Sequence, residues 1–302
     1  AEGIRCCYHG WMFDVEGRCL DQPCEPGGGA LRANVRQPWY PLEERYGLVF
    51  AYLGPPQRKP QLPRIDVLEE LGDGEMLEAD DTSLGGGGPA IIPCNWLQHY
   101  ENVVDPFHVP ILHGAFSGHQ FVPAMAQMPQ VKWLATEQGV RVTSWRTLDD
   151  GRRLQRVTEA ALPTLRVVPS PRLGSFGPVE SIGWVLPIDD THFRIYVAGR
   201  VKQSGDIGRM RSQMNGKFWW ELSDDEHRQY PGDYEAQTSQ GSITAHSAEH
   251  LRTSDRGVAL IRRCLREQME RVAAGDDPAC VVRSEGGGDA MLRFAHCGNF
   301  VP

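Results

Sequence analysis

The chain has 302 residues, 40% of them hydrophobic, which is enough to bury one substantial core and a second, smaller one. With a net charge of −8, the chain lacks the excess of basic residues that is typical of nucleic-acid-binding proteins. No stretch of the sequence approaches the roughly eighteen consecutive apolar residues of a membrane span. Eight cysteines with no signal peptide before them favour a reducing compartment over a disulfide framework, so we expect a cytoplasmic protein without a membrane partner.

The first 24 residues contain Cys6, His9, Cys19 and Cys24. Zinc accepts these ligand types, but the gaps of nine and four residues that follow His9 form no standard pairing of zinc knuckles. The same cysteines also fit small buried thiols beside an aromatic turn. The residues alone leave both interpretations open.

Residues 31–54 alternate apolar and polar side chains, which predicts strands of a small antiparallel sheet. Four prolines stand among residues 55–63, a composition typical of a linker. We therefore predict two domains, residues 1–56 and residues 57–302.

The segment 95–114 contains two histidines five residues apart, His108 and His113. A five-residue step on an α-helix turns by about 140°, so the two imidazoles would not share a face of a regular helix. Pro110 lies between them and is expected to break the helix, which would let the second imidazole swing back. Asn102 and Asp105 precede His108 at steps of three, which would place all three along one side of the helix.

Two imidazoles and one carboxylate, with coordination positions left open, suit a non-haem Fe(II) centre that activates O2. The plain alternative is two ordinary histidines on a half-buried helix, because short motifs recur by chance. His119 is a further imidazole nearby, which we expect to be polar lining rather than a ligand.

Strand patterns separated by turn signals dominate residues 130–200. The predicted strands are Val140–Trp145, Leu154–Ala160, Leu165–Val168, Ile182–Leu186 and Phe193–Ala198. They predict one large, curved antiparallel sheet.

The C-terminal third has helical periodicity after a cap at Ser254 or Asp255. The apolar stripe consists of Val258, Ile261, Leu265, Met269 and Val272. Gly275 is placed to end the helix, and residues 281–302 are predicted to be a partly ordered tail. The fold class is therefore α+β.

A carboxylate for the metal has to come from elsewhere in the chain. The candidates between the predicted sheet and the last helix are Asp224, Asp225, Glu226, Asp233 and Glu235. Composition does not choose among them, and most such acids are solvated surface groups.

The run Cys94–Gly114 reads C-N-W-L-Q, then E-N, D-P, H and L-H-G. In this it resembles the iron-binding segment of Rieske-type non-haem iron ring-hydroxylating oxygenases, in the alpha subunits of the phthalate and phenoxybenzoate dioxygenase group. The resemblance implies that His108 and His113 are iron ligands. In that family the aspartate ligand stands six residues before S-Q-G, as Asp233 stands before Ser239–Gly241, so the resemblance implies Asp233 as the third ligand.

The same resemblance makes Cys6 and His9 the second half of a Rieske 2Fe–2S motif, which the family continues as in Gly10–Asp14. A complete cluster needs two cysteines and two histidines. The family's first half, C-x-H, does not occur among the five residues before Cys6. We therefore expect the chain to begin inside a truncated, all-β Rieske domain and to hold half of the cluster ligands.

The resemblance further implies a catalytic domain whose antiparallel sheet grips C-terminal helices. An NAD(P)H-dependent reductase would supply electrons through the 2Fe–2S cluster to the mononuclear iron, where O2 is used to hydroxylate an aromatic substrate. Asn102 and Asp105 would orient an imidazole and bridge towards a cluster histidine of the adjacent subunit, which implies a homotrimer or a multiple of it.

Phthalate- and phenoxybenzoate-type relatives suggest a carboxylated substrate, which an arginine would bind through two hydrogen bonds. The candidates on or beside predicted strands are Arg141, Arg146, Arg166 and Arg194. The alternative from another class is a non-catalytic, cluster-less fragment that acts only as a metal-binding scaffold or oligomerisation partner.

Overall fold

The computed structural model of the chain describes residues 3–80, 88–117, 120–173, 176–209, 216–279, 281–283 and 290–302. The chain divides into two compact units, residues 1–45 with 49–59 and residues 46–48 with 60–302. The domain boundary predicted after residue 56 falls within the last segment of the first unit.

The N-terminal part is built from short strands and single helical turns. Its elements are the strands β1 (Ile4–Arg5), β2 (Met12–Phe13), β3 (Cys19–Asp21), β4 (Leu42–Arg45) and β5 (Leu48–Ala51) and the 3-10 turns η1 (Pro26–Gly28), η2 (Arg32–Asn34) and η3 (Pro56–Arg58). The strands β1, β2 and β3 form an antiparallel sheet in that order, and β4 pairs with β5. Tyr46 and Gly47 join these two strands with positive φ angles of 55° and 77°, the backbone of a tight two-residue hairpin turn.

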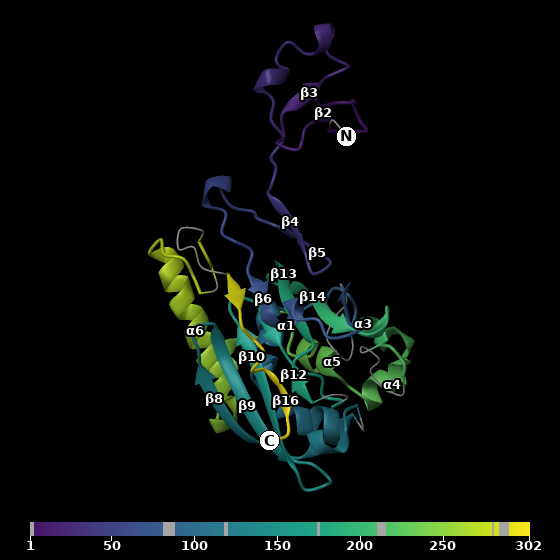
Figure 1. Ribbon diagram of the computed structural model, residues 1–302, viewed down its shortest axis with the longest axis vertical. Coiled ribbons are helices and arrows are strands. Elements are labelled where there is room, and N and C mark those ends of the chain that lie inside the picture. The colour runs from purple at the N-terminus through teal and green to yellow at the C-terminus, as the bar shows by residue number, and fades with distance from the viewer. Residues whose placement is uncertain are drawn as a thin grey trace. The chain divides into compact units, whose positions relative to one another are not determined.

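The larger unit is organised around a nine-stranded sheet in which every pairing is antiparallel (Figure 1). Its strands are β7 (Met76–Asp80), β8 (Gln130–Ala135), β9 (Gly139–Thr147), β10 (Arg153–Ala161), β11 (Leu165–Val167), β12 (Gly177–Pro178), β13 (Ser181–Asp189), β14 (His192–Val201) and β16 (Gly298–Phe300). The main path is β12-β16-β10-β11-β13-β14-β7, and β9 and β8 extend the sheet from the other edge of β10. Four of the five predicted strands lie within β9, β10, β13 and β14, and the fifth extends one residue beyond β11 at Val168. The predicted antiparallel sheet is confirmed.

The helices of this unit are mostly short. They are α1 (Asp66–Glu69), α2 (Trp96–Asn102), α3 (Asp206–Arg209), α4 (Asp224–Gln229), α5 (Asp233–Thr238) and α6 (Arg256–Ala273), the 3-10 turns η5 (Pro123–Ala126), η6 (Trp219–Glu221), η7 (His246–Ala248) and η8 (Thr253–Asp255), and the π-helix η4 (Val109–Phe116). None of the helices in the described part of the chain is long and apolar enough to cross a membrane. The long helix α6 packs against β8, β9 and α2.

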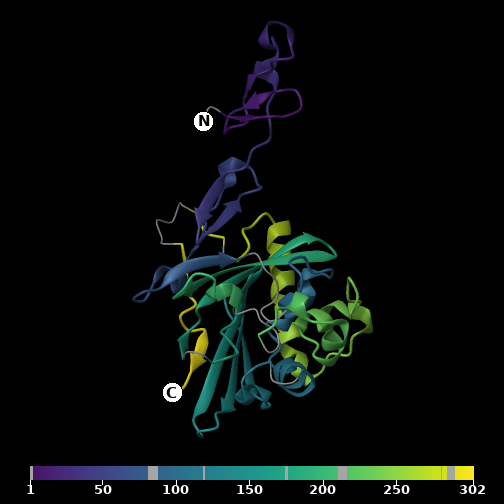
Figure 2. The ribbon, with the colours of Figure 1, turned by 90° about the vertical axis from the view of Figure 1, so that its right-hand side faces the viewer.

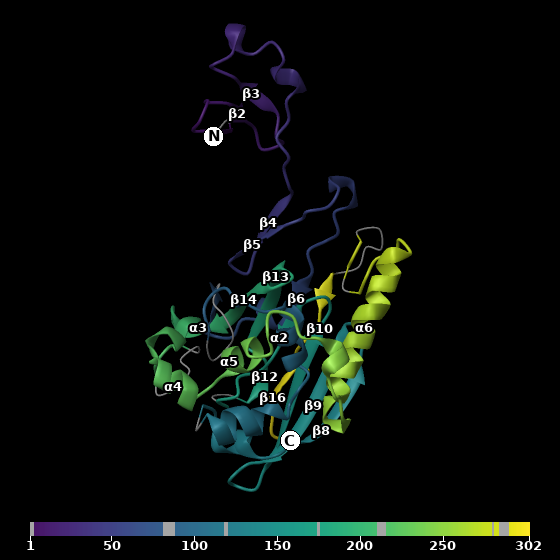
Figure 3. The same cartoon turned by 180° about the vertical axis from the view of Figure 1, so that it is seen from behind.

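Alternate residues of the strands supply two cores on opposite faces of the sheet, as the two-residue period of a strand requires. On one face Val142, Phe193 and Ile195 pack with Tyr100 of α2 and Ile261 of α6. On the other face Val157, Val167 and Ile182 pack with residues of β6 (Arg64–Ile65) and β15 (Met291–Leu292), two strands that pair in parallel. The side view and the view from behind show α5 and α6 on one side of the large sheet (Figures 2 and 3).

In the predicted partly ordered tail, residues 291–292 pair with β6 and residues 298–300 pair with β10. The predicted stripe on α6 is buried only in part: Ile261 is fully buried, whereas Met269 and Val272 are 70% and 56% exposed. The predicted end of the helix is confirmed, since Gly275 follows its last residues with a positive φ of 89°.

Candidate metal centre and cavity

His108 and His113 are brought together by a π-helix. The helix η4 begins directly after His108, and the backbone N–H of Ser117 donates to the carbonyl of Leu112 at 2.9 Å, an i to i+5 hydrogen bond. In such a helix, residues five apart lie above one another. The two imidazole ring centres are 5.4 Å apart.

The predicted helix break at Pro110 is wrong, and so is the continuous helical side through Asn102, Asp105 and His108. The helix α2 ends at Asn102, and residues 105–107 are not helical. Pro106 accounts for this, because a proline disfavours helical backbone in the residue before it and cannot donate a helical hydrogen bond. Pro110 lies in the first turn of η4, where no N–H is needed.

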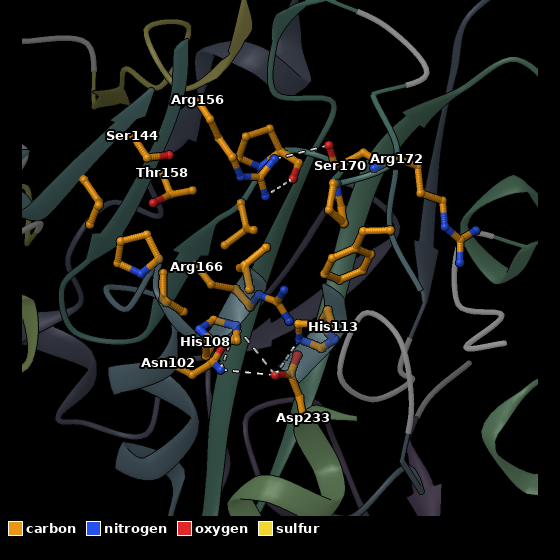
Figure 4. Close-up of a pocket in the computed structure, with 18 of the residues that line it drawn as sticks. Asn102, His108, His113, Ser144, Arg156, Thr158, Arg166, Ser170, Arg172 and Asp233 are labelled. Atoms are coloured by element: carbon orange, nitrogen blue, oxygen red, sulfur yellow. Dashed lines mark hydrogen bonds and ion pairs between the residues drawn. The ribbon is translucent and has the colours of Figure 1, made fainter. Parts of the chain in front are cut away.

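Asp233 completes a group of three with the two histidines (Figure 4). It is the first residue of α5, and its Oδ1 lies 3.2 Å from His113 Nε2 and 3.8 Å from His108 Nε2. One nitrogen or oxygen from each of the three side chains lies within 4.8 Å of the others.

The other four candidate acids are engaged elsewhere. Asp224 and Asp225 lie in the first turn of α4, where Asp225 is 95% exposed, and Glu226 caps that helix at Ser223. Glu235 accepts from Trp219 and contacts His227. His119 lies outside the described residues.

The charge of the site favours an ionised carboxylate. Burial raises the pKa of Asp233, but the charges of His113 and His108 and a hydrogen bond to His113 outweigh burial and hold the pKa well below its usual range. Burial lowers the pKa of His108, whereas Asp105 and Asp233 raise it to a net value above normal. An anionic oxygen facing two imidazoles is the arrangement that a divalent cation would occupy.

Asn102 and Asp105 lie around His108. The amide nitrogen of Asn102 donates to Asp233 Oδ1 at 3.1 Å and lies 3.2 Å from His108 Nε2. Asp105 Oδ2 lies 3.4 Å from His108 Nδ1, an ion-pair contact that falls outside hydrogen-bond geometry, and its Oδ1 accepts from the backbone N–H of Phe107 at 2.8 Å. Both side chains therefore touch or approach the imidazole without joining the group of three.

The donor set fits a mononuclear Fe(II) centre. Two imidazoles and one carboxylate are the facial set of non-haem iron oxygenases, which leaves further coordination positions open. All three residues line a cavity of about 210 Å³, so those positions would face this cavity. They are the three residues that the family resemblance implies as iron ligands.

Three buried or half-buried arginines line the same cavity, namely Arg146, Arg156 and Arg166. Figure 4 labels Arg156 and Arg166. None of the three forms an ion pair with a carboxylate of the described residues; Arg146 and Arg156 donate mainly to backbone carbonyls and polar side chains. Burial lowers the pKa of Arg146 to about 10 and, with help from the charge of Arg146, that of Arg156 to about 9.

Of the four arginines proposed from the sequence, Arg146 and Arg166 line the cavity, whereas Arg141 pairs with Glu159. Arg194 does not line the cavity, and Arg156 was missed. The alternation of side chains along the predicted strands could have identified Arg156. It pairs across the sheet with Ser144, so its side chain lies on the same face as Val142, Ser144 and Arg146.

The N-terminal candidates occupy a turn between β1 and β2. Cys6 and His9 are both exposed, and the backbone N–H of Gly10 donates to the carbonyl of Cys6 at 3.0 Å. Hydrogen bonds from the backbone N–H groups of Tyr8 and His9 lower the pKa of Cys6, which favours the thiolate that binds metals. The zinc interpretation is not supported, because Cys6, His9, Cys19 and Cys24 form no metal-sized group within the described ranges.

A second group of ligand types, Glu159, His296 and Cys297, also lies within 4.8 Å. Arg141 Nε lies 2.8 Å from Glu159 Oε2, and His296 Nε2 lies 2.7 Å from the same oxygen. The guanidinium already balances the carboxylate and would repel a cation, so this group is a buried ion-pair network.

No family model matches the chain. A curated relative, the phenoxybenzoate dioxygenase subunit alpha of Ectopseudomonas oleovorans, is 48% identical over 306 aligned positions that cover 99% of this chain and 73% of the relative. The oxygenase subunit of a tert-butanol monooxygenase / tert-amyl alcohol desaturase of Aquincola tertiaricarbonis is 34% identical and covers 97% of this chain, which spans 65% of that relative.

Among solved structures, dicamba monooxygenase bound to dicamba matches with a TM-score of 0.58 at 15% identity, covering 90% of this chain and 80% of that one. At this identity the match supports the fold alone, and the fold agrees with the predicted class. The identity to the phenoxybenzoate relative over nearly the whole chain carries the assignment. The chain belongs to the Rieske-type non-haem iron oxygenases, in the alpha-subunit group of the phenoxybenzoate and phthalate dioxygenases.

Proposed function

We propose that this chain is the part of a terminal oxygenase that uses O2 to hydroxylate an aromatic substrate carrying a carboxylate. One observation carries the proposal: the His108–His113–Asp233 group opens into a cavity lined by three arginines that form no ion pair with a carboxylate of the described chain. The first feature suits an oxygen-activating iron and the second suits an anionic substrate.

His108, His113 and Asp233 would hold Fe(II), and the bound iron would supply the activation of O2. Asn102 would orient the carboxylate of Asp233 through its hydrogen bond. Asp105 would orient the ring of His108 from the opposite nitrogen. Because one third of the Asp105 side chain is exposed, it would also be open to a hydrogen bond from another protomer of a homotrimer.

Residues 1–56 would belong to the Rieske domain and residues 57–302 to the catalytic domain. Cys6 and His9 would supply one cysteine and one histidine of a 2Fe–2S cluster, which takes two of each. An NAD(P)H-dependent reductase would be the electron donor. The relatives are named as oxygenase subunits, which favours this function over a scaffold without activity.

The substrate class rests on charge. A buried cation without a partner is costly, so a cavity with such arginines favours a ligand that brings the missing negative charge. The relative named for phenoxybenzoate acts, by its name, on a carboxylated aromatic, whereas the one named for tert-butanol does not. The arginines of the cavity favour a substrate of the first kind for this chain. Arg166 is the most suitable anchor, because the one hydrogen-bond contact of its guanidinium among the described residues is with His99, at 3.5 Å.

The metal assignment is tested by measuring the iron content of single alanine variants after reconstitution with Fe(II) in the absence of air. His113→Ala and Asp233→Ala should each lose most of the mononuclear iron, since two donors remain where three are needed. His192→Ala is the matched control, because His192 is a half-exposed histidine that pairs with Asp189 at 3.0 Å. Full iron content in Asp233→Ala would show that another acid is the ligand.

The substrate class is tested by calorimetric titration with phenoxybenzoate and with phenoxybenzamide, its uncharged analogue. Arg166→Gln should weaken phenoxybenzoate binding by at least about tenfold and leave phenoxybenzamide within about twofold, as the loss of a charged hydrogen-bonded pair predicts. Arg263→Gln, an exposed arginine on α6, controls for net charge. Equal effects on the two compounds would rule out the carboxylate anchor.

A further inference from the structure

Arg166 occupies space that exists only because its neighbour on the next strand is a glycine. Arg166 of β11 pairs directly with Gly183 of β13. A Cβ at position 183 would lie 2.6 Å from Arg166 Cγ and 2.8 Å from Cδ, distances that real Cβ atoms do not show. The arginine side chain therefore lies flat across β13, and any larger residue at 183 would push it away.

Gly183 is not needed for its backbone conformation. Its φ lies outside the left-handed region, so alanine would fit the backbone without strain. The absence of a Cβ thus serves the arginine specifically. An alanine there would test the position of one side chain, with little direct effect on the strand.

The other end of Arg166 meets His99 of α2. His99 is 1% exposed, and its ring stacks on Phe193 at 5.5 Å between centres. Its Nε2 lies 3.5 Å from Arg166 Nη1, the outer limit of a hydrogen bond, and its Nδ1 lies 3.3 Å from Gln237 Oε1.

These partners settle which ring nitrogen carries the proton. An arginine has only donors, so His99 Nε2 must accept, and Nδ1 carries the hydrogen that it donates to Gln237. Burial and then the charge of Arg166 lower the pKa of His99 to about 3, so the ring is neutral at neutral pH. Gln237 stands one helical turn after Asp233 on α5, so His99 connects the arginine to the helix that carries the carboxylate ligand.

We propose that Gly183 and His99 are positioning residues that set substrate specificity: Gly183 lets Arg166 lie across the sheet, and His99 fixes its guanidinium beside the His108–His113–Asp233 group (Figure 4). This inference rests on the proposed role of Arg166 as carboxylate anchor. An arginine that is already fixed loses little freedom when the ligand binds, so binding is tighter and the ligand ring is held at one distance from the metal group.

Gly183→Ala tests the first contact. Calorimetric titration of the full chain should show phenoxybenzoate binding weakened by about tenfold, with phenoxybenzamide within about twofold and iron content unchanged. In the background of Arg166→Gln, the same alanine should add less than about twofold, because its effect passes through the arginine. An additional tenfold loss in that double variant would show that Gly183 acts on the cavity in general, and would overturn its positioning role.

His99→Asn and His99→Gln test the second contact. Asparagine can keep a donor near Gln237 but removes the acceptor that faces Arg166, whereas glutamine places an oxygen near the position of Nε2. Phenoxybenzoate binding should fall several-fold in His99→Asn and recover most of that loss in His99→Gln, with phenoxybenzamide unchanged in both. Equal losses for the two compounds, or for the two variants, would overturn the role of His99.

The outcomes separate this inference from the proposed function. If Arg166→Gln leaves phenoxybenzoate binding unchanged, the carboxylate anchor itself is wrong. If Arg166→Gln weakens binding while Gly183→Ala and His99→Asn do not, the anchor stands and the positioning role fails. Thermal unfolding of each variant identifies a general loss of structure, which would weaken the binding of both compounds alike.

Discussion

Asn102 is the polar side chain that touches both an imidazole and the carboxylate of the metal group. Its amide nitrogen can only donate, so the nearby His108 Nε2 must present its lone pair. A metal ion that binds His108 would use this lone pair in place of the hydrogen bond from Asn102. The hydrogen bond from Asn102 to Asp233 therefore organises the group before any metal arrives.

Replacing this amide should weaken the metal site without removing a ligand. We expect Asn102→Leu to raise the apparent dissociation constant for Fe(II) by about tenfold to a hundredfold, the usual effect of losing a residue that orients a ligand. Competition with a chelator of known affinity measures this constant. A change below about twofold would mean that Asn102 is a bystander.

At the scale of elements, the structure brings His108 and His113 together as the sequence predicted, but through a different kind of helix. The spacing of His108 and His113 pointed to a metal, but an α-helix would have separated them, and a break at Pro110 was invoked to bring them together. The observed solution is a π-helix, in which the five-residue spacing is the natural one. Local propensity does not predict π-helices, because they are rare and depend on the surrounding packing.

Asp233 shows a different limit. It stands 120 residues after His113, and composition offered four other acids of the same kind. Nothing local distinguishes the first residue of α5 from the acids of α4; what chose it was a family motif. The stripe on α6 fails for a related reason, since helical periodicity shows which side is apolar but does not show where the packing partner ends.

The contact between α2 and α6 depends on an arginine held by two acids. Arg262 donates to both oxygens of Glu101 at 2.5 and 2.8 Å and to both oxygens of Glu249 at 2.5 and 3.0 Å. All three side chains are less than one fifth exposed. The ion pair between Arg262 and Glu101 therefore holds α2, which carries Asn102, against α6.

We expect Arg262→Met to lower the free energy of unfolding by about 3 kcal/mol, because it leaves two nearly buried carboxylates without their cation. Arg263→Met is the matched control: the neighbouring arginine is 62% exposed, 3.7 Å from Glu267, and should change stability by less than about 0.5 kcal/mol. Denaturant titration measures both. Equal effects of the two substitutions would show that the buried pairs contribute no more than surface charge does.

At the scale of the whole molecule, the C-terminal segment closes the large sheet. Gly298–Phe300 pairs with Gln155–Val157, although some 140 residues separate them. The strand is three residues long and has no alternating pattern, so the sequence offered no local sign of it. Long-range pairing of this kind is decided by the edge that β10 leaves open beside β11, which becomes visible only once the sheet is assembled.

Glu159 links β10 to the C-terminal segment. It is fully buried on β10 and accepts from Arg141 of β9 and from Thr136, and His296 of the C-terminal segment lies 2.7 Å from it. Burial raises the pKa of Glu159, but the hydrogen bonds from His296 and Arg141 outweigh it and bring the pKa below the usual 4.5. The ionised carboxylate therefore stabilises the folded state.

The sign of the pH dependence follows from that lowered pKa. Because the folded protein holds the Glu159 proton less tightly than the unfolded chain does, its contribution is fully present above about pH 4.5 and is lost as the pH falls through the folded pKa. Glu159→Gln cannot ionise, so it should be less stable than the unaltered chain by about 3 kcal/mol at pH 7.

That difference in the free energy of unfolding should stay constant down to about pH 5 and shrink below pH 4.5, where the unaltered chain also becomes protonated. Other acids titrate in the same range, but they do so in both proteins and cancel in the difference. Parallel denaturant titrations between pH 3 and pH 7 measure it. A difference that remains constant across this whole range would mean that the charge of Glu159 does not hold the C-terminal segment, and that packing around β16 does so alone.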